Sequence, residues 1–336
     1  MLNDAVAFFR SLEDEYAALR SDAALVDRSG RLRMVFSGPK AAEALSGLVT
    51  NDVISLKPGG GLYAAALTAK GKIIADLRVF ARDDGLLVDV PESAADGFAA
   101  MVRKFVNPRL AHVADISAST SCVGIYGPRA REKLAEIFAV GEDLLQALAP
   151  YQHLTLDNHA TPVAIAASPD LGVAGFDIFS GEGDAAALWS RLAKTGALPA
   201  GTAACDVARV EAGRPLCGTD MDENTLAQEA NLDALGGISY TKGCYTGQET
   251  VARLHFRGHV NKSLRGIHCS RVIPRGAQLF REDAQPCGEV RSSVESPRLG
   301  AIAIAMLKRG VDSGAQLIAR WEGGESAALV RDLPFD

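Results

Sequence analysis

A single cysteine, Cys244, lies in the segment YTKGCYTGQET at residues 240–250, between two glycines and close to a lysine. Thr246 begins a Ser/Thr-x-x-Glu capping-box pattern, and the apolar residues that follow predict a helix that starts near Gly247. Cys244 would then lie just before a helix N-terminus, where unpaired amides and the charge of Lys242 favour a thiolate. This setting is typical of a reactive or ligating sulfur. The alternative is a small buried apolar side chain in a turn.

Histidines follow the cysteine at a spacing that could bind a metal. His255 and His259 are four residues apart, so one helix could present both. Gly258 stands between them near the expected helix end, and no carboxylate or cysteine follows at a zinc-like spacing. We therefore expect a solvent-facing pair and no metal site. Arg253 and Arg257 make the stretch basic, which would either guide an anionic partner or form a solvated helix face.

The composition places limits on the function. The chain has 336 residues, 48% hydrophobic and 23% charged, which predicts a folded protein of more than one packed unit. A net charge of −6 argues against sequence-independent binding of nucleic acid. No Gly-rich phosphate loop, HExxH helix or GxSxG elbow occurs, so nucleotide hydrolysis, zinc proteolysis and serine hydrolase chemistry lack support.

The cysteines and the hydropathy pattern predict a location. The six cysteines include no CxxC pair, which fits reduced thiols in a cytoplasmic protein. The acidic N-terminal segment has no basic region followed by an apolar run, so we expect no secretion signal. No stretch of about 18 apolar residues is present, so we expect no membrane partner.

A repeated unit indicates how these residues are positioned. VFSGPKAAEALSGLV at 35–49 resembles GIYGPRAREKLAEIF at 124–138, and each predicts a strand, a Gly-Pro turn and a helix. The match indicates either two related α+β halves or a chance similarity of two strand-to-helix joints. Proline would occupy the first helical position.

Further elements are expected around the repeat. Strands are predicted in LYAAALTA, KIIADLRVF and GLLVDVP, with turns at Lys70-Gly71 and Asp84-Gly85. Helices are predicted over 92–105, over 182–195 and from about Ala203. After residue 260, short β-like runs joined by Gly, Pro and Asp turns predict a small barrel or sandwich.

The wider segment DALGGISYTKGCYTGQETVARLHFRG at 233–258 resembles the signature of the YgfZ-type folate-binding proteins, most specifically in KGCYTGQE. LVTNDVISLKPGGGLYAAALTAKGKIIADLRVF at 48–80 and RVEAGRPLCGTD at 209–220 are similar to the glycine-cleavage T-protein, an aminomethyltransferase. The resemblance implies an α+β fold, a three-subdomain cloverleaf around a channel that holds tetrahydrofolate. It implies a folate-binding region of two interleaved α+β subdomains over 1–250 and a C-terminal β-barrel over 260–336.

The same resemblance implies site residues. Glu211 of RVEAG matches the carboxylate expected to bind the pterin ring, since a carboxylate can accept two N–H donors. Its alternative role is that of an ordinary i,i+3 or surface partner for Arg209 or Arg214. Asn51 and Asp52 match residues near the folate site, and Arg209 is expected to lie there as well.

One departure from the aminomethyltransferases concerns their catalytic aspartate. The corresponding stretch here reads LLVDVPESAADGF at 86–98, where Asp89 and Asp96 do not reproduce the motif. We therefore assign no acid or base for C–N cleavage.

The YgfZ-type likeness implies a folate-dependent protein that supports iron-sulfur clusters in client enzymes, acting through Cys244 with Lys242 beside it. Iron ligation, mixed-disulfide chemistry and nucleophilic attack on a one-carbon unit all fit such a thiol. One thiolate cannot hold a cluster alone, so iron-sulfur client or assembly proteins are the expected partners. The alternative function is a folate-dependent aminomethyltransferase or demethylase.

Overall fold

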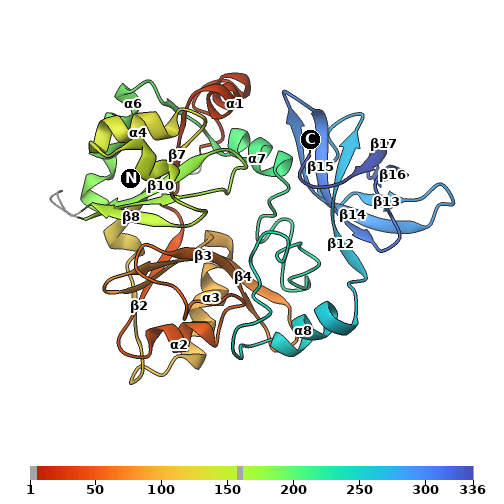
Figure 1. Cartoon of the computed structure of the whole chain (residues 1–336). Helices are drawn as coiled ribbons and strands as arrows, with labels where there is room; N and C mark the ends of the chain where they lie inside the picture. The colour runs from red at the N-terminus through yellow and green to blue at the C-terminus, as the bar shows by residue number, and fades with distance from the viewer. Residues whose placement is uncertain (1–5, 157–161, 336) are drawn as a thin grey trace.

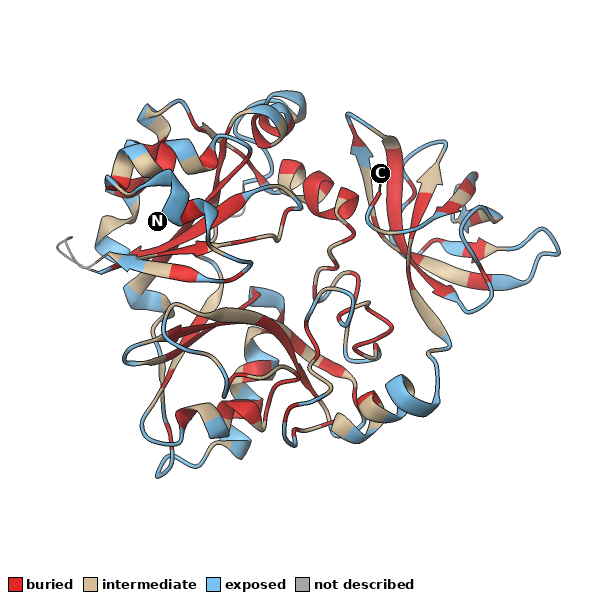
Figure 2. Ribbon diagram, in the orientation of Figure 1, coloured by how far each residue is buried: buried red, intermediate tan, exposed pale blue. Residues whose placement is uncertain are grey.

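The computed structural model describes residues 6–156 and 162–335, and it contains two sheets with their helices and a separate barrel (Figure 1). The α+β class and the C-terminal β-barrel predicted from the sequence are therefore confirmed. Buried residues concentrate in the strands, while helix α8 presents a largely exposed surface (Figure 2). The apolar strand surfaces thus form the cores that position the remaining side chains.

The first sheet is antiparallel, with strand order β3-β4-β5-β2-β6. Its two tight turns contain Gly71 and Gly85, both with positive φ, as the turn prediction requires. Helix α3 packs its apolar face on β4. The elements are β2 (Leu32–Ser37), β3 (Gly61–Leu67), β4 (Ile73–Arg82), β5 (Gly85–Val90), β6 (His112–Asp115), α2 (Ala41–Ser46) and α3 (Glu92–Phe105).

The second sheet has the order β11-β1-β7-β10-β9-β8, in which only the β1–β11 pair is parallel among the described strands. Strand β1 belongs to this sheet and β2 to the first, so the turn between them passes from one sheet to the other. The strands are β1 (Ala24–Asp27), β7 (Thr120–Tyr126), β8 (His153–Leu156), β9 (Val163–Ala167), β10 (Gly175–Gly181) and β11 (Leu198–Pro199). The helices and 3-10 turns are α1 (Leu12–Ser21), α4 (Ala130–Phe138), α5 (Glu142–Gln146), α6 (Ala185–Lys194), α7 (Thr202–Glu211), η1 (Ser117–Ser119) and η2 (Glu182–Asp184).

Each copy of the repeated unit forms a strand, a Gly-Pro turn and a helix, one copy in each sheet. Gly38 and Gly127 both adopt positive φ at the turn, which glycine allows without a steric penalty. The helices begin two residues after the prolines, at Ala41 and Ala130, so the proline lies in the turn and not at the first helical position.

The C-terminal strands close into a barrel with the order β12-β15-β14-β13-β16-β17, which removes free sheet edges. A long connection without regular strands or helices joins α7 to α8, and α8 leads into the barrel. The division of the chain at residues 250–260 stays a prediction. The elements are α8 (Gln248–Arg257), β12 (Lys262–Cys269), β13 (Gln278–Phe280), β14 (Pro286–Ser296), β15 (Gly300–Lys308), β16 (Gln316–Trp321) and β17 (Gly324–Arg331).

Candidate functional site

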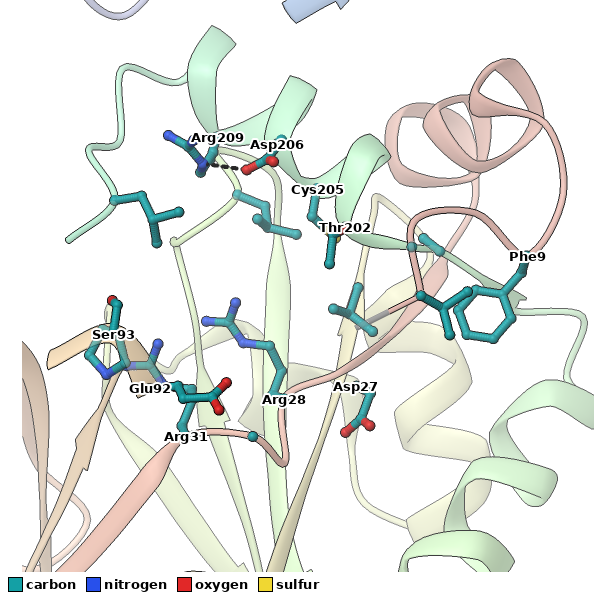
Figure 3. A pocket seen from close by; sticks show the side chains of 18 residues that line it. Phe9, Asp27, Arg28, Arg31, Glu92, Ser93, Thr202, Cys205, Asp206 and Arg209 are labelled. Atoms are coloured by element: carbon teal, nitrogen blue, oxygen red, sulfur yellow. Dashed lines mark hydrogen bonds and ion pairs between the residues drawn. The ribbon is translucent and has the colours of Figure 1, made fainter. Parts of the chain in front are cut away.

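A cavity of about 720 Å³ lies between α7 and the turn that joins β1 to β2 (Figure 3). This main cavity is of the size that takes a cofactor or a drug-sized ligand. Thr202 and Arg209 of α7 line one side, and Arg28, Arg31 and Glu92 lie on the opposite side. The remaining wall is largely apolar, but it also contains the carboxylates of Asp27 and Asp206. Its larger apolar side chains are those of Val6, Phe9, Val26, Leu171 and Leu216.

The N-terminal segment is fixed against α7 by one buried carboxylate. Oε1 of Glu15 accepts hydrogen bonds from the amides of Phe9 and Arg10, each at 2.6 Å. Its Oε2 accepts from the amide of Gly201 at 2.7 Å, directly before α7. Because Glu15 is fully buried, these charge-assisted hydrogen bonds hold the cavity wall that contains Phe9.

A buried cluster of arginines and aspartates lies beneath the main cavity. Arg78 pairs with Asp89 and Asp177, and its Nη1 lies 3.1 Å from Oδ2 of Asp170. Arg28, which lines the main cavity, donates from Nη2 to the same oxygen of Asp170 at 2.7 Å. The paired charges allow arginines to remain ionised in the interior, where an unpaired charge would be costly.

Asp89 and Asp96, the two aspartates considered for acid or base chemistry, are not among the described residues that line the cavities. Burial alone would raise the pKa of Asp89, but the guanidinium groups of Arg31 and Arg78 outweigh it and lower that pKa to about 2. Asp89 therefore stays ionised and paired at neutral pH, with Nε of Arg31 2.6 Å from its Oδ2. Asp96 is exposed on α3.

A smaller cavity of about 90 Å³ adjoins the main one and shares Arg28, Arg31 and Arg209 with it. Asp76 of β4 and Tyr63 of β3 also line this small cavity. The Tyr63 hydroxyl donates to Oδ2 of Asp76 at 3.0 Å. Burial raises the pKa of the Asp76 carboxyl, although Arg31 acts in the opposite direction. The small cavity thus contains a desolvated carboxyl group.

Arg209 lines both cavities. Its Nε lies 2.7 Å from Asp206, its Nη1 lies 2.8 Å from Asp220, and its Nη2 donates to Ser292 of the barrel at 2.9 Å. Because these partners occupy its donor groups, Arg209 joins α7 to the barrel and shapes the wall of the cavities. Its predicted role in ligand binding stays a prediction.

Glu211 lies at the end of α7 but is not among the described residues that line either cavity. Its Oε1 accepts hydrogen bonds from Tyr16 at 2.8 Å and from Ser296 at 2.5 Å. Its Oε2 forms ion pairs with Arg20 at 3.3 Å and Arg298 at 3.6 Å. Glu211 therefore pairs with Arg20 and Arg298, and not with Arg209 or Arg214 as the alternative had it. Binding of a pterin ring by Glu211 stays a prediction that no contact here supports.

Asn51 and Asp52 lie between α2 and β3 and are not among the described residues that line either cavity. The Asn51 side chain donates to the carbonyls of Tyr63 and Gly236, both at 2.8 Å. Asp52 accepts from the amide of Ile54 at 3.2 Å in a local turn. Both contacts stabilise the loop that faces residues 236–242, and a folate contact for this pair stays a prediction.

The Lys242 side chain donates hydrogen bonds to backbone carbonyls at and just beyond the C-terminal end of α2. Its Nζ donates to the carbonyls of Ser46 at 2.6 Å and Val49 at 2.7 Å, just past the helix C-terminus. An ammonium group at this end satisfies free carbonyls and complements the helix dipole. Desolvation lowers the pKa of Lys242 to about 8, although Asp52 and Cys244 act in the opposite direction. Lys242 therefore fixes the loop that carries Cys244.

Cys244 is the exposed cysteine among the six, all of which are free thiols. It lies in the loop before α8, which begins at Gln248 as the sequence predicted. The predicted capping box is wrong, because Gly247 takes the N-cap position and no side chain caps the helix. Thr246 instead contacts the carbonyl of Gly47 at 3.4 Å.

The predicted site residues thus form separate groups. Asn51 and Lys242 lie on neighbouring segments, because the amide of Ser239 bonds to the carbonyl of Thr50 at 2.9 Å. Only Arg209 of the predicted residues lines the cavities.

Sequence reasoning missed Arg28, Arg31 and Asp76, whose types and spacing carry no motif. The sequence feature that could have pointed to Asp76 is its position as a charged residue in the middle of the predicted strand KIIADLRVF.

His255 and His259 contact different neighbours. His255 stacks on Tyr240 with ring centroids 3.6 Å apart, and His259 contacts Arg309. Within 6–156 and 162–335, no cluster of three or more potential metal ligands occurs. No helix in this part of the chain has the length and apolar character needed to cross a membrane.

Comparisons with known proteins cover nearly the whole chain. Residues 4–238 match the family described as the GCVT N-terminal domain, and residues 262–336 match the glycine cleavage T-protein C-terminal barrel domain. An aminomethyltransferase from Rubrobacter xylanophilus is 31% identical over 329 residues, covering 97% of this chain and 87% of that protein. One from Bordetella petrii is 32% identical over 333 residues, covering 96% and 87%.

A solved structure has the same architecture. The glycine cleavage system aminomethyltransferase T from Bartonella henselae superposes with a TM-score of 0.87, covering 98% of this chain and 91% of that chain. At 24% sequence identity this likeness shows the fold alone. The shared fold is the arrangement of two α+β lobes and a C-terminal barrel.

Proposed function

The chain belongs to the glycine cleavage T-protein family, and from that premise we propose that it is a folate-dependent aminomethyltransferase. The main cavity is the proposed tetrahydrofolate site. The observation that carries this proposal is a cavity of about 720 Å³ whose walls are largely apolar and carry arginine side chains, together with the carboxylates of Asp27, Glu92 and Asp206. Relatives that carry the name aminomethyltransferase support the reaction class.

The chemistry of the lining fits the proposed ligand. Folate has a fused polar ring, an apolar aryl linker and a glutamate tail with carboxylates. Phe9, Leu171 and Leu216 offer apolar contacts for the linker, and the guanidinium groups of Arg28 and Arg31 favour bound carboxylates. Bound tetrahydrofolate would supply the amine nitrogens that carry the one-carbon unit.

The protein's own contribution is to orient the ligand and to exclude water. The segment held by Glu15 places Phe9 beside α7, and the paired aspartates keep Arg28 in one orientation. A preorganised site of this kind reduces the entropy that binding costs. Asp89 is not proposed as the acid or base, because its low pKa and its pairing keep it ionised.

An assay of methylenetetrahydrofolate formation from an aminomethyl donor tests this function. Thr202 is exposed at the cavity wall on α7, so Thr202→Trp should obstruct the site and abolish most turnover. Ala100→Trp on the exposed face of α3 is the control and should retain wild-type turnover. Absence of turnover in the wild type would contradict the proposal.

As a second candidate, we propose a YgfZ-type role in which the protein supports iron-sulfur clusters of client enzymes through Cys244. One observation favours it: Cys244 is exposed in a loop that Lys242 fixes to α2, whereas the other cysteines are at least partly buried. A single thiolate would need ligands from a partner to hold a cluster. Complementation of cells that lack the protein tests this role, because Cys244→Ser should then fail to restore the activity of iron-sulfur enzymes.

A further inference from the structure

The segment 6–10, which we call the N-terminal strap, forms part of the wall of the main cavity although none of its residues is buried. Val6 and Phe9 of the strap line the cavity. Val6, Phe8 and Phe9 leave 42%, 50% and 42% of their surfaces exposed. Because the strap buries so little apolar surface, it has the character of the low-stability segments that open locally in native proteins.

Backbone groups attach the strap to the first turn of α7. The amide of Thr202 donates to the carbonyl of Val6 at 2.9 Å, and the amide of Ala203 donates to the carbonyl of Ala7 at 3.3 Å. Amides at a helix N-terminus have no partner within the helix, so the strap satisfies two of them. The remaining attachment is the buried carboxylate of Glu15, which accepts from two strap amides and from the amide that precedes α7. Water can replace the strap at each of these polar contacts.

Gly201, directly before α7, leaves the space that the strap occupies. A Cβ atom at this position would overlap the carbonyl group of Ala7 and would lie 2.6 Å from the carbonyl oxygen of Val6. The φ of −83° and ψ of −179° at Gly201 are extended values that alanine adopts without strain. Replacement of Gly201 by alanine would therefore conflict with the strap and not with its own backbone conformation.

We propose that the N-terminal strap is a lid over the main cavity, which opens to admit the ligand and closes on it, with Glu15 as the latch. The inference rests on the proposed function, in which this ligand is a folate. Phe9 and Val6 would contact an apolar part of the ligand only in the closed position. Binding therefore stabilises the closed state through contacts that the open state lacks, and the lid controls the rate of ligand release.

Two substitutions should open the lid by different routes. Gly201→Ala fills the space that the strap occupies. Glu15→Gln keeps the size of a side chain that is not among the described residues lining the cavity, but its amide nitrogen cannot accept a hydrogen bond from a backbone amide. Gly141→Ala is the control, because Gly141 has an ordinary φ of −66° and a Cβ there would meet no described atom within 4 Å beyond its chain neighbours.

Hydrogen exchange of the free protein tests whether the lid opens. In the wild type, the protection factors of the Phe9 and Arg10 amides should be at least about tenfold lower than that of Leu19, which is buried in α1. Gly201→Ala and Glu15→Gln should lower the protection of the two strap amides further, and Gly141→Ala should leave it unchanged. Protection of the strap amides equal to that of Leu19 in the wild type would overturn the lid.

Stopped-flow displacement of bound tetrahydrofolate tests what the lid does. We expect Gly201→Ala and Glu15→Gln to release the ligand about tenfold faster than the wild type, and Gly141→Ala to release it at the wild-type rate. Wild-type release rates in both variants would overturn the lid. If Gly201→Ala does not fold, a wild-type release rate in Glu15→Gln overturns it. Failure of the wild type to bind tetrahydrofolate would instead remove the proposed function, and the exchange experiment on the free protein would still decide whether the strap opens.

Discussion

The carboxylate of Glu211 accepts a 2.8 Å hydrogen bond from the hydroxyl of Tyr16, and this contact joins the end of α7 to α1. The same carboxylate accepts from Ser296 in the barrel. Glu211 is therefore a junction between lobe and barrel, although its sequence context predicted a ligand group. Burial and the hydrogen bond to Glu211 raise the pKa of the Tyr16 hydroxyl.

Replacement of Glu211 by Gln should destabilise the protein. The amide oxygen of Gln can still accept hydrogen bonds from Tyr16 and Ser296. The buried charge that pairs with Arg20 and Arg298 would be lost, at a cost of roughly 1–3 kcal/mol in the free energy of unfolding. Urea denaturation measures this change. Glu295→Gln, an exposed neighbour of Ser296 on β14, should be close to neutral. Equal stability of the two variants would contradict the structural role of Glu211.

Asp89 supplies a second prediction. Asp89→Asn should lower the free energy of unfolding by about 3–5 kcal/mol at neutral pH, because Arg31 and Arg78 would lose a buried counter-charge. Since the folded pKa of Asp89 is about 2, below the ordinary 3.8, its contribution is present above pH 4 and is lost as pH falls towards 2. The difference in unfolding free energy between the wild type and Asp89→Asn should therefore shrink as the pH falls from 4 towards 2.

Lys242 should make a contribution to stability that also rises with pH, but in the alkaline range. Its folded pKa of about 8 lies below the ordinary 10.5, so the unfolded chain binds more protons between these values. The contribution of Lys242 to stability therefore rises as pH increases from 8 to 10.5. The difference in unfolding free energy between the wild type and Lys242→Met should grow over this range. A difference that shrinks would contradict the burial of the ammonium group.

Thiol alkylation should be selective for Cys244. Burial raises the pKa of Cys205, Cys217 and Cys269 to about 12, whereas Cys244 is exposed. Native protein treated with iodoacetamide should gain one adduct at Cys244, which mass spectrometry locates. The Cys244→Ser variant should gain no adduct over the same reaction time. Urea should expose the remaining thiols. Faster labelling of a buried cysteine would contradict the described exposure.

The sequence predicted the regular elements well, because local apolar patterns determine them. The helix expected over 92–105 is observed as Glu92–Phe105, and the strand in KIIADLRVF is observed as Ile73–Arg82. The predicted side-chain cap of α8 was wrong because Thr246 instead contacts Gly47, a residue distant in the chain. Tertiary contacts of this kind override a local pattern.

The site itself was less predictable than the fold. Arg28 comes from the turn after β1 and Asp76 from the middle of β4, and only the packing of two sheets brings them to one cavity. Arg28 stands in no recognised motif, and Asp76 lies within the T-protein-like segment 48–80 without having been singled out there. The glutamate in RVEAG was the more conspicuous candidate, yet its helix end faces the barrel.

The most direct test of the account is calorimetric titration of the wild-type protein with tetrahydrofolate under anaerobic conditions. We predict saturable binding to one site, with an affinity that Thr202→Trp reduces and Ala100→Trp leaves unchanged. The absence of saturable binding to the wild type would contradict the assignment of the main cavity as a folate site.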